Sequence, residues 1–128
     1  MMPLLLLAAA SADLDALDQS VTQCDRTAAN PVFAGEAARR SKFLIDAYKE
    51  QEAIVNARLD IATQRQALAD AGGHTAAQAK DLDLQDLALD ARMKALNDQR
   101  SLEAAREAAM DAMRNYFLLH CPAGGERS

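Results

Sequence analysis

The segment Ala71-Gly72-Gly73-His74 divides this 128-residue chain into two long arms. Glycine and proline are absent from Glu36 to Ala71 and again from His74 to Cys121. These two residue types interrupt helices most often, so each arm predicts one long helix and the Gly-Gly pair predicts the turn between them. The sequence therefore favours two antiparallel helices joined at residues 70–74.

The two cysteines lie at matching distances from this turn. Cys24 precedes Gly72 by 48 residues, and Cys121 follows Gly73 by 48 residues. In an antiparallel hairpin this register brings the two side chains together, and an even cysteine count in an exported chain is typical of a disulfide. We expect Cys24–Cys121 to close the open end of the hairpin, with facing residue numbers that add up to about 145.

The composition predicts a single all-α domain. Alanine, leucine, glutamate, glutamine, arginine and lysine lose little side-chain freedom in a helix, and they dominate the chain. Alternating apolar and polar runs that would indicate strands are absent from the sequence. A length of 128 residues corresponds to one domain at most.

Residues 1–12 have features of a signal peptide. An apolar run from Leu4 to Ala10 leads into Ala10-Ser11-Ala12, which has the small-x-small form of a signal-peptidase site. We expect cleavage after Ala12 and a periplasmic or secreted protein. The alternative is a cytoplasmic protein whose first helix has an apolar start. Every apolar run is too short to cross a bilayer, so we expect no stable membrane insertion.

The mature domain is expected to span residues 13–121. Within it we predict a short helix at 13–26, long helices at about 31–69 and 75–119, and a disordered tail at 122–128. Asn30-Pro31 fits a helix cap followed by proline at the first helical position, and Thr75 with Gln78 fits a capping box. The short helix is expected to pack at the cysteine end, where the register also gathers all the aromatic residues: Phe33, Phe43, Tyr48, Tyr116 and Phe117.

Each long arm carries an apolar stripe. On the first arm the broad stripe comprises Leu44, Ile45, Ala47, Tyr48, Ile54, Val55, Leu59, Ile61, Ala62 and Leu68. On the second arm a row with near-heptad spacing comprises Leu84, Ala88, Ala91, Ala95, Leu102, Ala105, Ala109, Ala112 and Tyr116. It is widened by Leu87, Leu89, Met93, Leu96, Met110, Met113 and Phe117. Stripes broader than a coiled-coil seam indicate more than one neighbour for each helix.

Two arginines interrupt the apolar stripe of the first arm. Arg58 and Arg65 are one heptad apart, and the cysteine register places them near Asp86 and Asp81, within reach of Asp83 and Asp90. We expect inter-helix ion pairs that set the register of the hairpin more than its stability. The basic group Arg39, Arg40 and Lys42 is interpreted as a solvated helix face.

A catalytic, metal or cofactor site is not expected. The acidic residues Asp81 to Asp90 lack the glycine and the closing glutamate of a calcium loop. A metal or redox site built from Cys24, Cys121 and His120 is a minor alternative, because adjacent ligands have poor bite geometry and no CxxC occurs.

The charge pattern restricts the class of partner. The net charge is −5, and acidic and basic residues are interspersed, which argues against nucleic acid. We therefore expect a non-enzymatic, exported helical hairpin that binds other proteins or itself, in a chaperone-like or structural role. The shape class is similar to that of small periplasmic hairpin chaperones and adaptors, with no motif that links it to one family. A cytosolic coiled-coil structural protein is the alternative.

Overall fold

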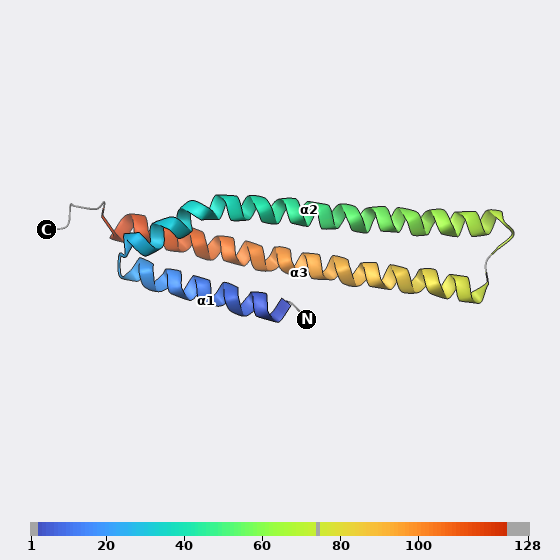
Figure 1. The fold of residues 1–128 in the computed structure, drawn as a ribbon, viewed down its shortest axis with the longest axis horizontal. Helices are drawn as coiled ribbons and strands as arrows, with labels where there is room; N and C mark the ends of the chain where they lie inside the picture. The colour runs from blue at the N-terminus through green and yellow to red at the C-terminus, as the bar shows by residue number, and fades with distance from the viewer. Residues whose placement is uncertain (1–2, 74, 123–128) are drawn as a thin grey trace. The chain divides into compact units, whose positions relative to one another are not determined.

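A computed structural model describes residues 3–73 and 75–122. It contains three helices in these ranges, α1 (Pro3–Thr22), α2 (Arg26–Asp70) and α3 (Ala76–His120), and no strand (Figure 1). The helices α2 and α3 form an antiparallel hairpin, and α1 is the short N-terminal helix packed at its base. The predicted fold class is confirmed.

The chain divides into two compact units. Unit 1 consists of Met1–Ser41 and Glu103–Ser128, and unit 2 consists of Lys42–Leu102. Unit 1 therefore contains α1, the first part of α2 and the last part of α3. Unit 2 contains the rest of the two long helices and the turn that joins them.

The core of unit 2 is a pair of rows with a period of seven residues. Ala47, Ile54 and Ile61 of α2 are buried, as are Leu82, Leu89 and Leu96 of α3. Ile54, Ile61, Leu82 and Leu89 form one cluster, with Ala57, Leu68 and Met93 packed against it. A strict period of seven keeps these side chains along one seam of each helix, as in a coiled coil.

The turn of unit 2 has capping contacts on both sides. Gly72 N–H donates to Ala69 O (3.1 Å) and Gly73 N–H donates to Leu68 O (2.9 Å), the pattern of a Schellman motif. Gly72 has a φ of 98°, which glycine adopts without the steric penalty of a side chain. Thr75 and Gln78 exchange side-chain to backbone hydrogen bonds of 3.2 and 2.9 Å, so the predicted capping box is confirmed.

The core of unit 1 is a three-helix cluster, as expected for the base. Its buried members come from all three helices and from the residue that follows α3: Leu17, Val21, Ala29, Met110, Phe117 and Cys121. Leu14, Cys24, Val32, Phe33 and Met113 pack against them. The rings of Phe33 and Phe117 lie 5.8 Å apart in a tilted arrangement. Most of the large apolar side chains of α1 that are described face this cluster.

The helix boundaries differ from the expected ones on the N-terminal side. Helix α1 begins at Pro3 rather than at residue 13 and ends at Thr22 rather than at 26, and it crosses the expected cleavage point after Ala12 without a break. The signal peptide stays a prediction. Residues 123–128, where a disordered tail is expected, lie outside the described residues, as does His74 of the turn.

The predicted cap at Asn30-Pro31 is wrong. Helix α2 begins at Arg26, so Pro31 lies inside it. Asp25 is the cap instead, because its Oδ1 accepts a hydrogen bond from Ala28 N–H at 3.2 Å. Proline is tolerated in the second turn here, although it removes one backbone donor.

The apolar row expected on α3 is not the one that packs. Leu84, Leu102 and Tyr116 of that row are exposed, whereas the buried residues Leu89, Leu96, Met110 and Phe117 come from the side chains that were expected only to widen it. Members of the expected row lie one residue before or two residues after a buried residue, as Ala88 and Ala91 do around Leu89, which rotates them by about 100° or 200° from the buried row. The row of leucine, methionine and phenylalanine is the inner one because it buries more apolar surface than alanines can.

Candidate functional site

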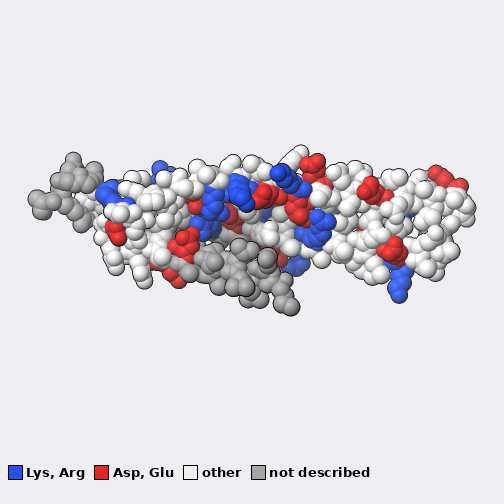
Figure 2. Space-filling model, in the orientation of Figure 1, with Lys and Arg blue, Asp and Glu red and all other residues white. Residues whose placement is uncertain are grey.

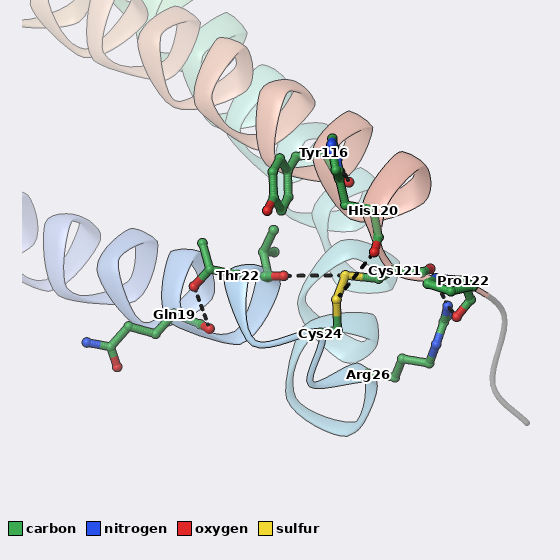
Figure 3. Close-up of a disulfide and its surroundings, with 9 residues drawn as sticks. Gln19, Thr22, Cys24, Arg26, Tyr116, His120, Cys121 and Pro122 are labelled. Atoms are coloured by element: carbon green, nitrogen blue, oxygen red, sulfur yellow. Dashed lines mark hydrogen bonds between the residues drawn. A yellow bond between two sulfur atoms is a disulfide. The ribbon is translucent and has the colours of Figure 1, made fainter. Parts of the chain in front are cut away.

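A disulfide joins Cys24 to Cys121 in unit 1 (Figure 3). The two Cα atoms are 5.4 Å apart, and 97 positions separate the residues in the sequence. Cys121 is buried among the core residues of unit 1, and Cys24 packs against the same cluster. The disulfide predicted from the distances to the Gly-Gly turn is therefore present.

Cys24 also ends α1. It has a φ of 54°, and it is the only non-glycine residue with a positive φ among those described. Its N–H donates to Val21 O (3.1 Å), and the N–H of Asp25 donates to Ser20 O (2.8 Å). This is a Schellman motif with cysteine at the position that glycine usually occupies. The left-handed conformation directs the chain from α1 into the cap of α2 within three residues.

Arg26 makes a second connection at the same place. From the first turn of α2 its guanidinium donates to Cys121 O (2.5 Å) and to Pro122 O, and it lies 5.2 Å from the centroid of the Phe117 ring. The last carbonyl groups of a helix have no intrahelical donor and carry partial negative charge. Arg26 therefore supplies hydrogen-bond donors to carbonyl groups at the C-terminal end of α3, and its guanidinium lies over the face of the Phe117 ring.

The disulfide uses both thiols of the alternative metal or redox site. Disulfide sulfurs cannot act as thiolate ligands, so His120 is left without its expected partners. The ring of His120 instead stacks on Tyr116 at 4.2 Å, and its Nδ1 lies 3.1 Å from Tyr116 O (Figure 3). Within residues 3–73 and 75–122 no three metal-ligating side chains are gathered together.

A layer of charged side chains crosses unit 1. Glu36 is only 8% exposed, and its carboxylate accepts hydrogen bonds from Arg39 at 2.7 and 3.0 Å. Arg39 also donates to both carboxylate oxygens of Glu103, one of them at 3.0 Å. Arg106 lies 3.5 Å from Glu36 and 2.9 Å from Asp13 of α1. The layer thus connects α1, α2 and α3 through alternating charges.

The pKa directions in this layer follow from its contacts. Burial of the Glu36 carboxyl opposes ionisation, but the hydrogen bonds from Arg39 and Arg106 outweigh it, so the pKa of Glu36 lies below its usual value. The hydrogen bonds to Glu36 and Glu103 raise the pKa of Arg39 further above its usual value. Glu36 and Arg39 are therefore a fixed ion pair at neutral pH.

The sequence interpretation of the basic group was incomplete. Arg39 belongs to the charged layer, and Arg40 is half-buried and lies 3.1 Å from Glu107 and 3.3 Å from Asp111. Only Lys42 is highly exposed, in a pair with Asp46. One sequence signal pointed to this layer. Glu103 occupies the place of an apolar residue in the seven-residue row that contains Leu96 and Met110.

Arg58 and Arg65 bind aspartates of α3 in unit 2. Arg58 lies 2.6 Å from Asp90 and 3.8 Å from Asp86. Arg65 lies 2.8 Å from Asp86 and 2.9 Å from Asp83. The hydrogen bond from Arg65 to Asp86, followed by that to Asp83, raises the pKa of Arg65. Asp86 is therefore shared between the two arginines.

Asp81 does not take part in these pairs, which corrects the expected set. Its carboxylate accepts a hydrogen bond from Gln85 at 2.9 Å. The register alone would allow contact with Arg65, but each residue turns the helix by about 100°. Asp83 and Asp86 follow the buried Leu82 and lie on one side of the seam, whereas Asp81 precedes Leu82 and lies on the other.

An exposed apolar surface of unit 2 lies on α2. We call it the α2 face, and it consists of large side chains with exposed fractions from 46% to 67%: Leu44, Ile45, Tyr48, Val55 and Leu59. They fill about four turns of one helix, away from the seam that packs on α3. A shallow hollow adjoins the face and is lined by Leu59, Ala62, Thr63, Gln66, Ala67 and Asp70.

A second exposed row lies on α3 of the same unit. Leu84, Leu87 and Leu102 are its large members, each about half exposed or more. Between Leu87 and Leu102 the row consists of small or polar residues. The α2 face is therefore the denser of the two apolar surfaces.

Charged residues of both signs are interspersed on the visible surface (Figure 2). No helix among the described residues has the length and apolar character needed to cross a membrane. Comparisons with protein-family models, with curated proteins and with solved structures find no match to this chain.

Proposed function

We propose that this protein is an exported helical hairpin that binds other proteins through the α2 face, in a chaperone-like or structural role. The observation that carries the proposal is the exposure of five large apolar residues, Leu44 to Leu59, along one helix. Contiguous exposed apolar patches on a soluble domain commonly mark interaction sites.

The surroundings of the face support a binding role. Another side of α2 is held by Ile54 and Ile61 in the core of unit 2 and by the ion pairs of Arg58 and Arg65. A helix fixed in this way presents its outer side chains without the cost of ordering its backbone on binding. Tyrosine and leucine on a helix offer large contact area for an apolar partner segment.

Export is supported by the Cys24–Cys121 disulfide together with the signal peptide expected at residues 1–12. Structural disulfides persist in oxidising compartments such as the periplasm and are rare in the cytoplasm. The intact mass of the native protein, measured with and without reduction before alkylation, tests this part. A chain that starts at Asp13 with protected cysteines supports export. A full-length chain with two reactive thiols would favour the cytosolic alternative.

Binding is tested with a denatured client. Citrate synthase diluted from guanidinium aggregates, and light scattering measures how far the mature protein suppresses this. We expect Leu59→Glu to reduce the suppression, because a charge replaces an apolar contact on the α2 face. Leu87→Glu is the matched control, since Leu87 is 61% exposed and Leu59 is 60% exposed. Equal suppression by the native protein and both variants would refute a binding role for this face.

A further inference from the structure

We propose that the α2 face binds the same face of a second copy of this chain, in an antiparallel two-fold dimer. The inference rests on the proposed function, since it names the protein that occupies this face. It depends on the spacing of the exposed residues and on the charges beside them.

The spacing of the face reads the same in both directions. Leu44, Tyr48, Val55 and Leu59 are separated by four, seven and four residues. In an antiparallel pair with its two-fold axis between residues 51 and 52, Leu44 of one copy lies opposite Leu59 of the other. Tyr48 then lies opposite Val55. A two-fold interface requires a self-complementary patch of this kind.

The side chains are arranged for helix packing. Leu44 with Tyr48, and Val55 with Leu59, are pairs four residues apart, and such pairs form the ridges that interdigitate in the commonest class of helix contact. Each copy contributes two ridges with a gap at residues 51–52 between them. Leu44, Tyr48, Val55 and Leu59 of each copy would thus be covered by apolar partners. Ile45, at the edge of the face, lies opposite Arg58 of the other copy.

Charges beside the face agree with the antiparallel arrangement. Glu52 borders the face, and Lys49 lies about one turn earlier on the same side. Both side chains are exposed, and the ion pairs described in unit 2 use Lys42, Asp46, Glu50 and residues further along, but neither Lys49 nor Glu52. In the two-fold pair the same sides of the two helices adjoin. Glu52 of each copy then lies beside the axis, next to Glu52 of the other, and Lys49 of each copy lies on the same side within reach of these two carboxylates.

The exposed row on α3 does not have this symmetry. Leu84, Leu87 and Leu102 are separated by three and fifteen residues, so no antiparallel pairing places all three opposite large apolar side chains. The two rows therefore make different predictions, and substitutions of equal exposure on each can separate them.

Sedimentation velocity over a concentration series is the main test. We expect the mature native protein to form dimers as its concentration rises and Leu59→Glu to raise the dimer dissociation constant by about tenfold or more, because the substitution occurs twice in a two-fold interface. Leu87→Glu should sediment as the native protein does. If Leu59→Glu loses helical circular dichroism, Tyr48→Gln gives the same readout with a milder change.

Crosslinking tests the orientation. A Glu52→Cys variant places thiols beside the two-fold axis, so mild oxidation should give a covalent dimer on a non-reducing gel. Leu44→Cys alone should remain monomeric, whereas a mixture of Leu44→Cys and Leu59→Cys should crosslink. Crosslinking of Leu44→Cys to itself would indicate a parallel pair and would overturn the arrangement.

Two results would refute the dimer itself. One is sedimentation as a monomer at every concentration, and the other is dissociation caused by Leu87→Glu but not by Leu59→Glu. If the protein is monomeric and Leu59→Glu still loses suppression of citrate synthase aggregation, the proposed binding function stands and only the second copy is excluded. If neither property depends on Leu59, both proposals fail.

Discussion

Cys24 and Cys121 are joined across 97 positions of sequence, and Cys24 is at the same time the left-handed residue that ends α1. One residue therefore both closes the base of the hairpin and directs the chain between two helices. A side chain costs free energy in this conformation, and glycine would avoid that cost. Cysteine at this position forms the disulfide with Cys121, which glycine cannot do.

Two double variants separate these roles. Cys24→Ala with Cys121→Ala should lower the free energy of unfolding by about 4–5 kcal/mol, the chain-entropy value for a loop of this size. Cys24→Gly with Cys121→Ala loses the same bond but should be more stable than the alanine version by about 1 kcal/mol, because glycine accepts the left-handed conformation. Urea unfolding measures both values. Equal stability of the two variants would show that this conformation is not retained without the bond.

The charged layer of unit 1 predicts a pH dependence. The pKa of Glu36 is lower in the folded protein than in the unfolded chain, so the folded state favours the ionised carboxylate. The resulting stability is fully present above the unfolded pKa of Glu36, and it is lost as the pH falls through the lower folded pKa.

Glu36→Gln isolates the contribution of that residue. At pH 7 the free energy of unfolding of the variant should be roughly 2 kcal/mol lower than that of the native protein, as expected when hydrogen bonds to a charged group are lost. The difference should shrink as the pH is lowered towards 2, because the native carboxylate then becomes neutral as well. Urea unfolding at a series of pH values measures it. A difference that stays constant with pH would mean that Glu36 acts through packing rather than charge.

Substitution of Asp86 tests the ion pairs of unit 2, and substitution of Asp81 is the matched control. Asp86→Ala removes the partner shared by Arg58 and Arg65, so we expect a small decrease in the urea midpoint that is reduced in high salt. Asp81→Ala should cause a smaller, different change, since Asp81 contacts only Gln85 among the described contacts of its carboxylate. Equal, salt-dependent losses in both variants would contradict the assignment of Asp86 as the shared partner.

The fold was predictable because its main signals are local or symmetric. Gly72 and Gly73 require a turn, and Thr75 with Gln78 requires a helix start, whatever the rest of the chain does. The disulfide followed from equal distances on both sides of that turn. The start of α2 was not predicted because both Asp25 and Asn30 can cap a helix. In the structure the cap is Asp25, five residues before Asn30, because its side chain accepts a hydrogen bond from Ala28 N–H.

The positions of side chains around each helix were less predictable. Register fixes which residues lie at the same height, but Asp81 and Asp86 differ by the side of the seam on which they lie. On α3 two rows share the period of seven, so period alone cannot decide which one faces α2. The charged layer was not predicted because arginines on a helix surface are usually solvated. The sequence does not show that the buried carboxylate of Glu36 lies beside Arg39 and Arg40.

Leu87 and Leu89 test which row of α3 is the inner one. Leu89 is 5% exposed in the core of unit 2, so Leu89→Ala should lower the free energy of unfolding by about 2–5 kcal/mol through lost burial and a cavity. Leu87 is exposed on the opposite face, and Leu87→Ala should change stability by about 0.5 kcal/mol or less. Urea unfolding of both variants at a low protein concentration measures the difference. The reverse order of effects would mean that the side of α3 that carries Leu87, rather than the row that contains Leu89, packs against α2.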